Sequence, residues 1–174
     1  VNAAYELEFL LNYQGTRPMV PSISVFAAVV VTPLDASTPV YDGDKVVVKA
    51  SGFDPAANPG TRMPLKDVPA GAYAVFGSFS PAWKESAGAP SSARKNSFQR
   101  WAMSDASAAA GNMTSNPQRI KLNDDGTFTA ELTVGAVTGA PSDGRYGVYT
   151  YPGSGAVNAA YELEFLLNYQ GTRP

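Results

Sequence analysis

The amino-acid sequence predicts an all-β domain, and three observations support this fold class. Turn-forming residues are frequent, with 16 Gly and 14 Pro among the 174 residues. Charged residues make up only 16% of the chain. Several segments alternate apolar and polar side chains, which is the period of a strand with one buried face. Together these features are typical of many short strands joined by turns.

The first predicted strands lie between residues 23 and 53. Residues 23–32 are rich in β-branched side chains and end at Pro33, which predicts either one strand covered on both faces or two short strands with a kink. An Asp-Gly turn at 42–43 then leads into a predicted strand over residues 45–53. We expect its lysines to mark the face in water. The residues expected to face the core are Val46, Val48 and Ala50.

The middle of the chain predicts loops around one clear strand. Residues 54–70 are dense in proline and are expected to form a loop, whereas the aromatic-rich residues 72–79 predict a strand. Residues 82–118 lose the apolar alternation, so we expect one long loop insertion there. Within it, residues 92–103 are compatible with a short strand or a helical turn.

The last third predicts a hairpin and two further strands. Residues 119–122 and 127–134 flank an Asn-Asp-Asp-Gly turn, which is typical of a half-buried hairpin. Residues 146–151 and 160–169 form the remaining predicted strands. About seven strands separated by turns, without a strong helix, are typical of an immunoglobulin-like (Ig-like) antiparallel β-sandwich.

One 18-residue segment, VNAAYELEFLLNYQGTRP, occurs twice without a change, at residues 1–18 and 157–174. The copies begin at Val1 and Val157 and set a period of 156 residues, so they indicate recent tandem duplication or deliberate design. We predict one Ig-like repeat domain over residues 19–174. Residues 1–18 are then a copy of the terminal strand and linker of a preceding or neighbouring repeat, with residues 14–22 as a short stiff linker.

Alternate side chains of the duplicated segment are large and apolar, and we expect them to point inward. The expected outward residues of the second copy are Glu162, Glu164, Leu166 and Asn168. The inward set, which we assign as the inter-unit strand, is Tyr5, Leu7, Phe9, Leu11, Tyr13, Tyr161, Leu163, Phe165, Leu167 and Tyr169. Burial of five such side chains contributes at most about 8–15 kcal/mol, so a repeat without this strand is not expected to fold.

Two interpretations of the first copy stay open. It completes the preceding domain of a tandem array, or it is donated between subunits by strand complementation or domain swapping.

The chain contains neither Cys nor His, which removes the thiolate nucleophile, the usual general base and the commonest metal ligand. We predict a protein that is not an enzyme, with no catalytic residues, no metal site and no cofactor. A net charge of −2 and a pI near 5.1 give no long-range attraction to nucleic acid. No apolar run approaches the roughly 20 residues of a membrane helix, so we expect no membrane insertion.

Two groups of residues are candidates for covalent chemistry or ligand binding. The parts of an isopeptide bond are Lys45 or Lys49, Asn168, and Glu162 or Glu164, but alternation points them outward, whereas such a bond needs a buried amine. Aromatic and basic side chains interleave in the 82–118 insertion, where they either form a sugar-stacking or anionic-ligand surface or anchor the loop. These residues are Trp83, Lys84, Arg94, Phe98, Arg100 and Trp101.

Four segments together resemble a known family pattern. They are VYDGDKVVVKASGFDP at 40–55, GAYAVFGSF at 71–79, NDDGTFTAELTV at 123–134 and YGVYTYPGSGAVNAAYE at 146–162. They resemble the Ig-like domains of actinobacterial cell-surface proteins, which often accompany heme-uptake (HtaA-type) domains and are distantly similar to the neocarzinostatin apoprotein sandwich. The resemblance implies a secreted or wall-linked Ig-like module. The disulfides of the apoprotein group have no counterpart here, no His is present as a heme ligand, and no ligand residues are carried over.

These observations predict a structural repeat of an extracellular bacterial fibre, pilus-like filament or adhesin stalk, whose partners are identical or tandem copies of itself. The alternative is an Ig-like module that binds a host or cell-wall glycan, or a small ligand, through residues 82–118.

Overall fold

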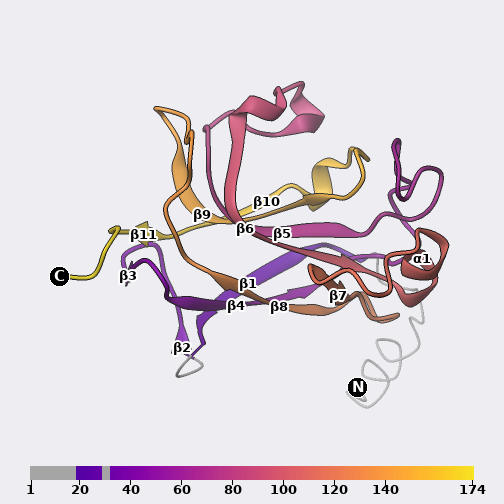
Figure 1. The fold of residues 1–174 in the computed structure, drawn as a ribbon, viewed down its shortest axis with the longest axis horizontal. Helices are drawn as coiled ribbons and strands as arrows, with labels where there is room; N and C mark the ends of the chain where they lie inside the picture. Colours follow the sequence, from indigo (N-terminus) through magenta and orange to yellow (C-terminus); the bar gives the residue numbers. More distant parts are fainter. Residues whose placement is uncertain (1–18, 29–31) are drawn as a thin grey trace, which may run out of the picture.

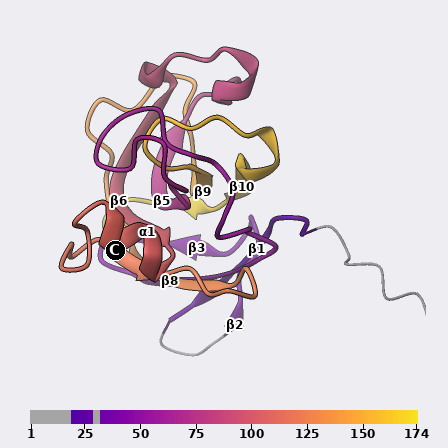
Figure 2. The ribbon, with the colours of Figure 1, turned by 90° about the vertical axis from the view of Figure 1, so that its right-hand side faces the viewer.

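The computed structural model describes residues 19–28 and 32–174. Within these ranges the backbone is mostly β. Its helical elements are α1 (Asp105–Ala110) and the 3₁₀ helices η1 (Glu85–Ala87), η2 (Ser91–Ala93) and η3 (Ala159–Tyr161). Its strands are β1 (Ser22–Ala27), β2 (Thr32–Pro33), β3 (Pro39–Val40), β4 (Lys45–Ser51), β5 (Ala72–Phe79), β6 (Arg94–Met103), β7 (Arg119–Lys121), β8 (Phe128–Thr133), β9 (Arg145–Pro152), β10 (Leu163–Leu166) and β11 (Asn168–Tyr169). They form two facing sheets and one two-stranded pair (Figures 1 and 2).

The first sheet has the strand order β2-β1-β4-β8, and all its neighbours are antiparallel. β1 pairs with β4 so that Ser22 lies opposite Ser51 and Ala27 lies opposite Val46. Alternate residues of β4 and β8 are buried, and the lysines of β4 are exposed. The predicted faces of these two strands are therefore confirmed.

The second sheet has the order β10-β9-β5-β6-β7 and is antiparallel except for β7, which runs parallel to β6. Its central strand, β5, is buried on both faces. Ala74 and Phe76 face the first sheet, whereas Val75 and Phe79 belong to a second cluster on the outer face. A register shift between Phe76 and Gly77 marks a β-bulge against β6.

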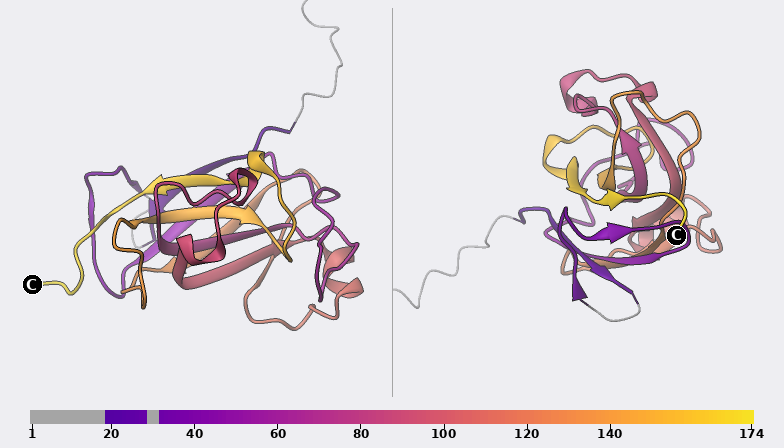
Figure 3. Two further views of the ribbon diagram at one scale, coloured as in Figure 1. Left: turned by 90° about the horizontal axis from the view of Figure 1, so that it is seen from above. Right: turned by 90° about the vertical axis from the view of Figure 1, so that its left-hand side faces the viewer.

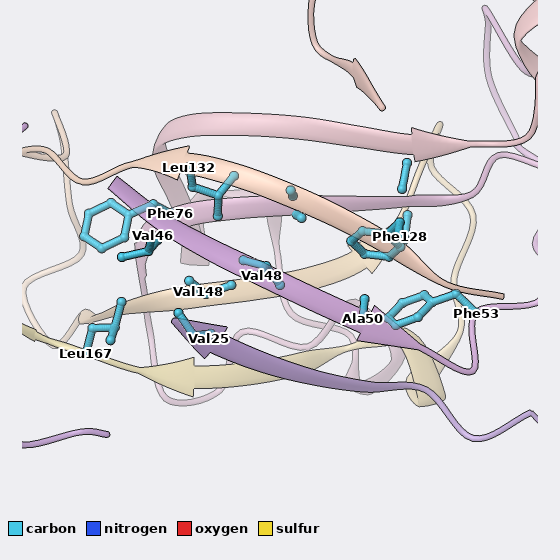
Figure 4. Close-up of a cluster of buried hydrophobic side chains, with 14 of the residues drawn as sticks. Val25, Val46, Val48, Ala50, Phe53, Phe76, Phe128, Leu132, Val148 and Leu167 are labelled. Atoms are coloured by element: carbon cyan, nitrogen blue, oxygen red, sulfur yellow. The ribbon is translucent and has the colours of Figure 1, made fainter. Parts of the chain in front are cut away.

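The main core lies between the two sheets and is viewed in Figure 4. Valine side chains from β1, β4 and β9 meet there with aromatic rings from both layers, and Phe53 contacts Phe128 edge-on at a centroid distance of 5.0 Å. Leu167, near the end of the chain, belongs to the same cluster. The prediction of a β-sandwich is confirmed at this level.

The expected loop over residues 82–118 is corrected by the structure. β6 pairs with β5 along its length, and α1 and β7 follow it, so the true loop on this side is limited to residues 80–93. Only Trp101, Ala102 and Met103 of β6 are buried, so the strand lacks the alternation that would have predicted it. Residues 92–103, for which the sequence leaves a short strand or a helical turn open, contain the ten-residue strand β6.

The expected last strand, residues 160–169, is divided into three pieces. η3 comes first, β10 pairs antiparallel with β9, and β11 pairs parallel with β3 in the separate two-stranded pair. The division occurs at Leu167, whose N–H donates to the Tyr146 carbonyl, while the Tyr169 N–H donates back to the Leu167 carbonyl at 3.1 Å. This tight turn shifts the chain from one partner strand to another.

The described chain begins and ends toward opposite ends of the longest axis of the domain (Figures 1 and 3). At one end of β4, the Val20 carbonyl lies against Gly52. At the other end, the Asp42 N–H donates to the Gly171 carbonyl at 2.9 Å. Strand β4 therefore runs between the point where the domain starts and the point where it finishes.

Candidate functional site

The second copy of the duplicated sequence, residues 157–174, is docked on the sandwich along its length, and we call it the closing segment. We call the surface of β9, β3 and β1 on which it lies the slot. Its inward residues all pack in or against the main core, as the sequence predicts. These residues are Tyr161, Leu163, Phe165, Leu167 and Tyr169.

The start of the closing segment is tied to the loop that follows β4. The Asn158 side-chain amide donates to Asn58 at 2.8 Å, and its carbonyl caps η3 by accepting from the Ala160 N–H. The Tyr161 hydroxyl donates to the Asp54 carbonyl at 3.3 Å. The Tyr161 ring also contacts Phe53 edge-on at 4.9 Å, so this end is held by both polar and apolar contacts.

The middle of the closing segment forms the edge strand β10. It pairs with β9 from Leu163 opposite Thr150 to Leu166 opposite Gly147. A Cβ atom on Gly147 would lie only 2.5 Å from the Phe165 carbonyl oxygen. The backbones approach so closely that only glycine fits at this position.

The last inward residue, Tyr169, is enclosed by other aromatic rings. It stacks on Tyr146 at 4.4 Å and meets Phe76 edge-on at 5.9 Å. Its hydroxyl donates to the Asp42 carboxylate at 2.6 Å. Burial, together with this hydrogen bond and the negative charge of Asp42, raises the pKa of Tyr169 to about 12.

The end of the closing segment is fixed at the turns on both sides of β3. The Asn168 amide donates to the Ser37 carbonyl at 3.0 Å, and Arg173 donates to Asp44 at 2.8 Å. The Arg173 guanidinium also lies 4.5 Å from the centre of the Tyr41 ring. The contacts therefore extend to the penultimate residue of the sequence.

Of the two glutamates that the alternation places on a solvated outer face, Glu164 is exposed as predicted and Glu162 is buried. Glu162 is only 1% exposed, and it accepts hydrogen bonds from the backbone N–H of Ser86, at 2.9 Å, and from the Ser86 hydroxyl. Glu164 accepts from the Trp83 indole at 3.0 Å and from Arg145 at 3.0 Å. Alternation correctly turns both side chains away from the main core, but the 80–93 loop covers Glu162 and leaves Glu164 exposed, in contact with Trp83.

The two tryptophans of the expected ligand surface are buried in separate clusters. Trp83 is 1% exposed and packs with Phe79 and Tyr149, whereas Trp101 is 5% exposed and donates from its indole to the Ala70 carbonyl at 2.7 Å. Both indoles thus anchor the chain on the sandwich. Their burial gives the glycan-binding alternative no support.

The remaining four residues of that group are spread over the loop and β6. Arg94 donates to the Trp83 carbonyl at 3.0 Å and pairs with Glu85 at 3.2 Å. Arg100 lies 4.9 Å from the centre of the Phe98 ring, and Lys84 is exposed. Arg94 also borders a cavity of about 220 Å³ beside Tyr151, but its charge there is already balanced by the pair with Glu85.

The residues that could have supplied an isopeptide bond are not brought together, in agreement with the outward orientation expected from the sequence. Lys45 donates to Thr133 at 2.7 Å on the exposed face of the first sheet, and Lys49 lies over the Phe26 ring at 4.9 Å. Asn168 is engaged with the Ser37 carbonyl, as described above. In the part of the chain that the structure describes, no group of three or more Asp or Glu side chains is placed to hold a metal ion.

The first copy of the inter-unit strand lies outside the described residues. Its predicted inward side chains are Tyr5, Leu7, Phe9, Leu11 and Tyr13. Comparison with protein-family models, curated proteins and solved structures finds no match to this chain. None of the helices in the ranges 19–28 and 32–174 has the length and apolarity to cross a membrane.

Proposed function

We propose that this chain is a structural repeat module of an extracellular bacterial fibre, pilus-like filament or adhesin stalk, with units joined through the duplicated terminal strand. The observation that carries the proposal is the identity of residues 1–18 with the closing segment, which completes the core of the domain. The same 18-residue sequence therefore ends one unit, as residues 157–174, and directly precedes the start of a unit at Met19, as residues 1–18. Consecutive units in a tandem array are then linked through the strand that closes the first of them.

The positions of the two chain ends support an extended array. Met19 and Val20 lie at the Gly52 end of β4, and Arg173 is bound at the Asp44 end. These ends are separated by about eight residues of extended chain, or about 26 Å. Units that follow one another in this way place their long axes in line.

The junction between units is expected to be stiff because few residues are left free. Arg173 is bound to its own domain, and Pro21, two residues after Met19, is buried. In the first occurrence of the junction, Pro18 is followed directly by Met19. Pro174 and the next two residues would therefore form the entire connection, and proline further restricts it.

We also propose that the sandwich is Ig-like. The order β1-β4-β8 in one sheet and β10-β9-β5-β6 in the other matches the Ig arrangement in which strands A, B and E face strands G, F and C with an added C′ strand. The extracellular assignment rests on the resemblance to actinobacterial cell-surface domains.

Pulling single molecules of a tandem array tests the proposed function. Each 156-residue unit should unfold in one event that releases about 50 nm of chain, since an extended residue spans about 3.3–3.6 Å. The control is an array with Leu167→Ala in every unit, which should unfold at lower force with the same increment. A load-bearing role would be contradicted if the units extended without a force peak, as a mobile loop does. It would also be contradicted if they unfolded in much shorter increments.

A further inference from the structure

The slot has two distinct ends, which fix the direction in which any copy of the duplicated sequence must lie. Tyr161 is bound near Asp54, just after β4, and Arg173 is bound at Asp44, just before β4. The sequence therefore runs antiparallel to β4, from its last residue toward its first. A first copy seated in the same way would bring Pro18 to the place that Pro174 takes, at the Asp44 end.

The start of the domain lies at the opposite end. Ser22 is paired with Ser51, the last residue of β4. The Val20 carbonyl lies so close to Gly52 that a Cβ atom added there would clash with it. The Met19 side chain lies equally close to Gly126. Met19 is thus held beside the turns that follow β4 and precede β8.

The place that Pro18 would take at the Asp44 end and the observed place of Met19 at the Gly52 end cannot be joined by one peptide bond. Pro18 and Met19 are consecutive residues, so their Cα atoms are about 3.8 Å apart. The two ends of β4 are about 26 Å apart. The first copy therefore cannot fill the whole slot of its own domain, up to the place of Pro174, while β1 keeps its place in the first sheet.

We infer that the segment Val1–Pro18, seated along its whole length as residues 157–174 are, completes the slot of a second copy of this chain and not its own. This inference rests on the proposed function, because it assumes that the duplicated sequence is what joins units. An exchanged segment can then lie in only one direction. Its Pro18 is at the Asp44 end of the acceptor domain, and from that point the donor chain continues into its own Met19. An exchanged assembly has the same head-to-tail order as a covalent tandem array.

The test weakens the closing segment and leaves the first copy intact within the full chain. The variant carries Phe165→Asp and Leu167→Asp, and its matched control adds the equivalent changes Phe9→Asp and Leu11→Asp. We expect the first variant to form oligomers whose mass, measured by light scattering, at least doubles and rises with protein concentration. We expect the control to remain monomeric.

Three results would overturn the inference. They are a folded monomer of the first variant, an unfolded monomer of that variant, and oligomers of the control equal to those of the variant. A synthetic peptide of sequence VNAAYELEFLLNYQGTRP, added to the control, shows by circular dichroism whether a weakened slot still accepts the strand. If the peptide restores the fold but the first variant stays monomeric, exchange is excluded, while in-line linkage of intact units remains as the proposed function.

Discussion

Arg173 donates to Asp44 across 2.8 Å and fastens the end of the closing segment to the turn that begins β4. The side chain of Arg173 is 65% exposed and that of Asp44 is 30% exposed, so the pair contributes only about 0–1 kcal/mol to the free energy of unfolding. Its importance is positional. The ion pair places the last residues of one domain at the end opposite to its first residues.

Replacing Leu167 with alanine should lower the free energy of unfolding by about 2–5 kcal/mol, because the side chain is 6% exposed within the main core. The matched control is Leu11→Ala, the same change in the first copy. In the monomeric chain this control should leave the free energy of unfolding unchanged, as measured by urea denaturation. Equal losses in both variants would mean that the two copies share the slot.

Replacing Gly147 with alanine should displace β10, since the new Cβ atom would lie 2.5 Å from the Phe165 carbonyl oxygen. We expect a loss of about 1–3 kcal/mol, typical of overpacking. Gly135→Ala is the control, because the nearest atom to a Cβ there is 3.9 Å away. Thermal melts of both variants give the comparison, and a stable Gly147→Ala protein would show that β10 is not tightly paired with β9.

Replacing Trp83 with phenylalanine removes the indole donor to Glu164 but keeps an aromatic ring beside Phe79 and Tyr149. The lost hydrogen bond to a charged group should cost about 1–3 kcal/mol. Hydrogen exchange should quicken at the amides of residues 163–166. Trp101→Phe, which removes a donor to Ala70, should leave exchange at these amides unchanged, and equal effects of the two changes would refute the specific link between the loop and the closing segment.

Alkaline pH should release the end of the closing segment. The pKa of Tyr169 is raised from 10.0 to about 12, chiefly by burial and then by Asp42. A group whose pKa is higher in the folded protein stabilises the fold fully below its unfolded pKa, and this contribution is lost as pH rises from about 10 to 12. The difference in absorbance at 295 nm between the native chain and Tyr169→Phe should report this titration. A midpoint near 10 would show that Tyr169 is not enclosed.

Strands β4 and β8 were predictable because each has one face in the core and one in water. β4 and β8 alternate in this way, and their buried residues were identified from the sequence. The inward side chains of the closing segment were identified for the same reason, since five large apolar residues at every second position have no other stable placement.

The parts that were missed depend on contacts between segments distant in sequence. Glu162 was expected in water because alternation specifies only the face of the strand, and nothing local reveals that Ser86 and its loop cover that face. The sequence did not distinguish β6 from a helical turn, because the exposed half of this strand lacks alternation. For Trp83 and Trp101 the sequence offers two interpretations, a ligand surface or anchors of the loop, and their contacts with Glu164 and Ala70 support the second.

We propose that the segment that completes one unit holds the next unit in line with it. Small-angle X-ray scattering of a two-unit protein, in which Pro174 is followed directly by a second Met19–Pro174, tests this most directly. The matched control carries a flexible glycine-serine linker between Pro174 and Met19. We predict a maximum dimension close to twice that of one unit and a pair-distance distribution with two separate maxima. We expect the control to show neither feature. A distribution indistinguishable from that of the control would contradict the account.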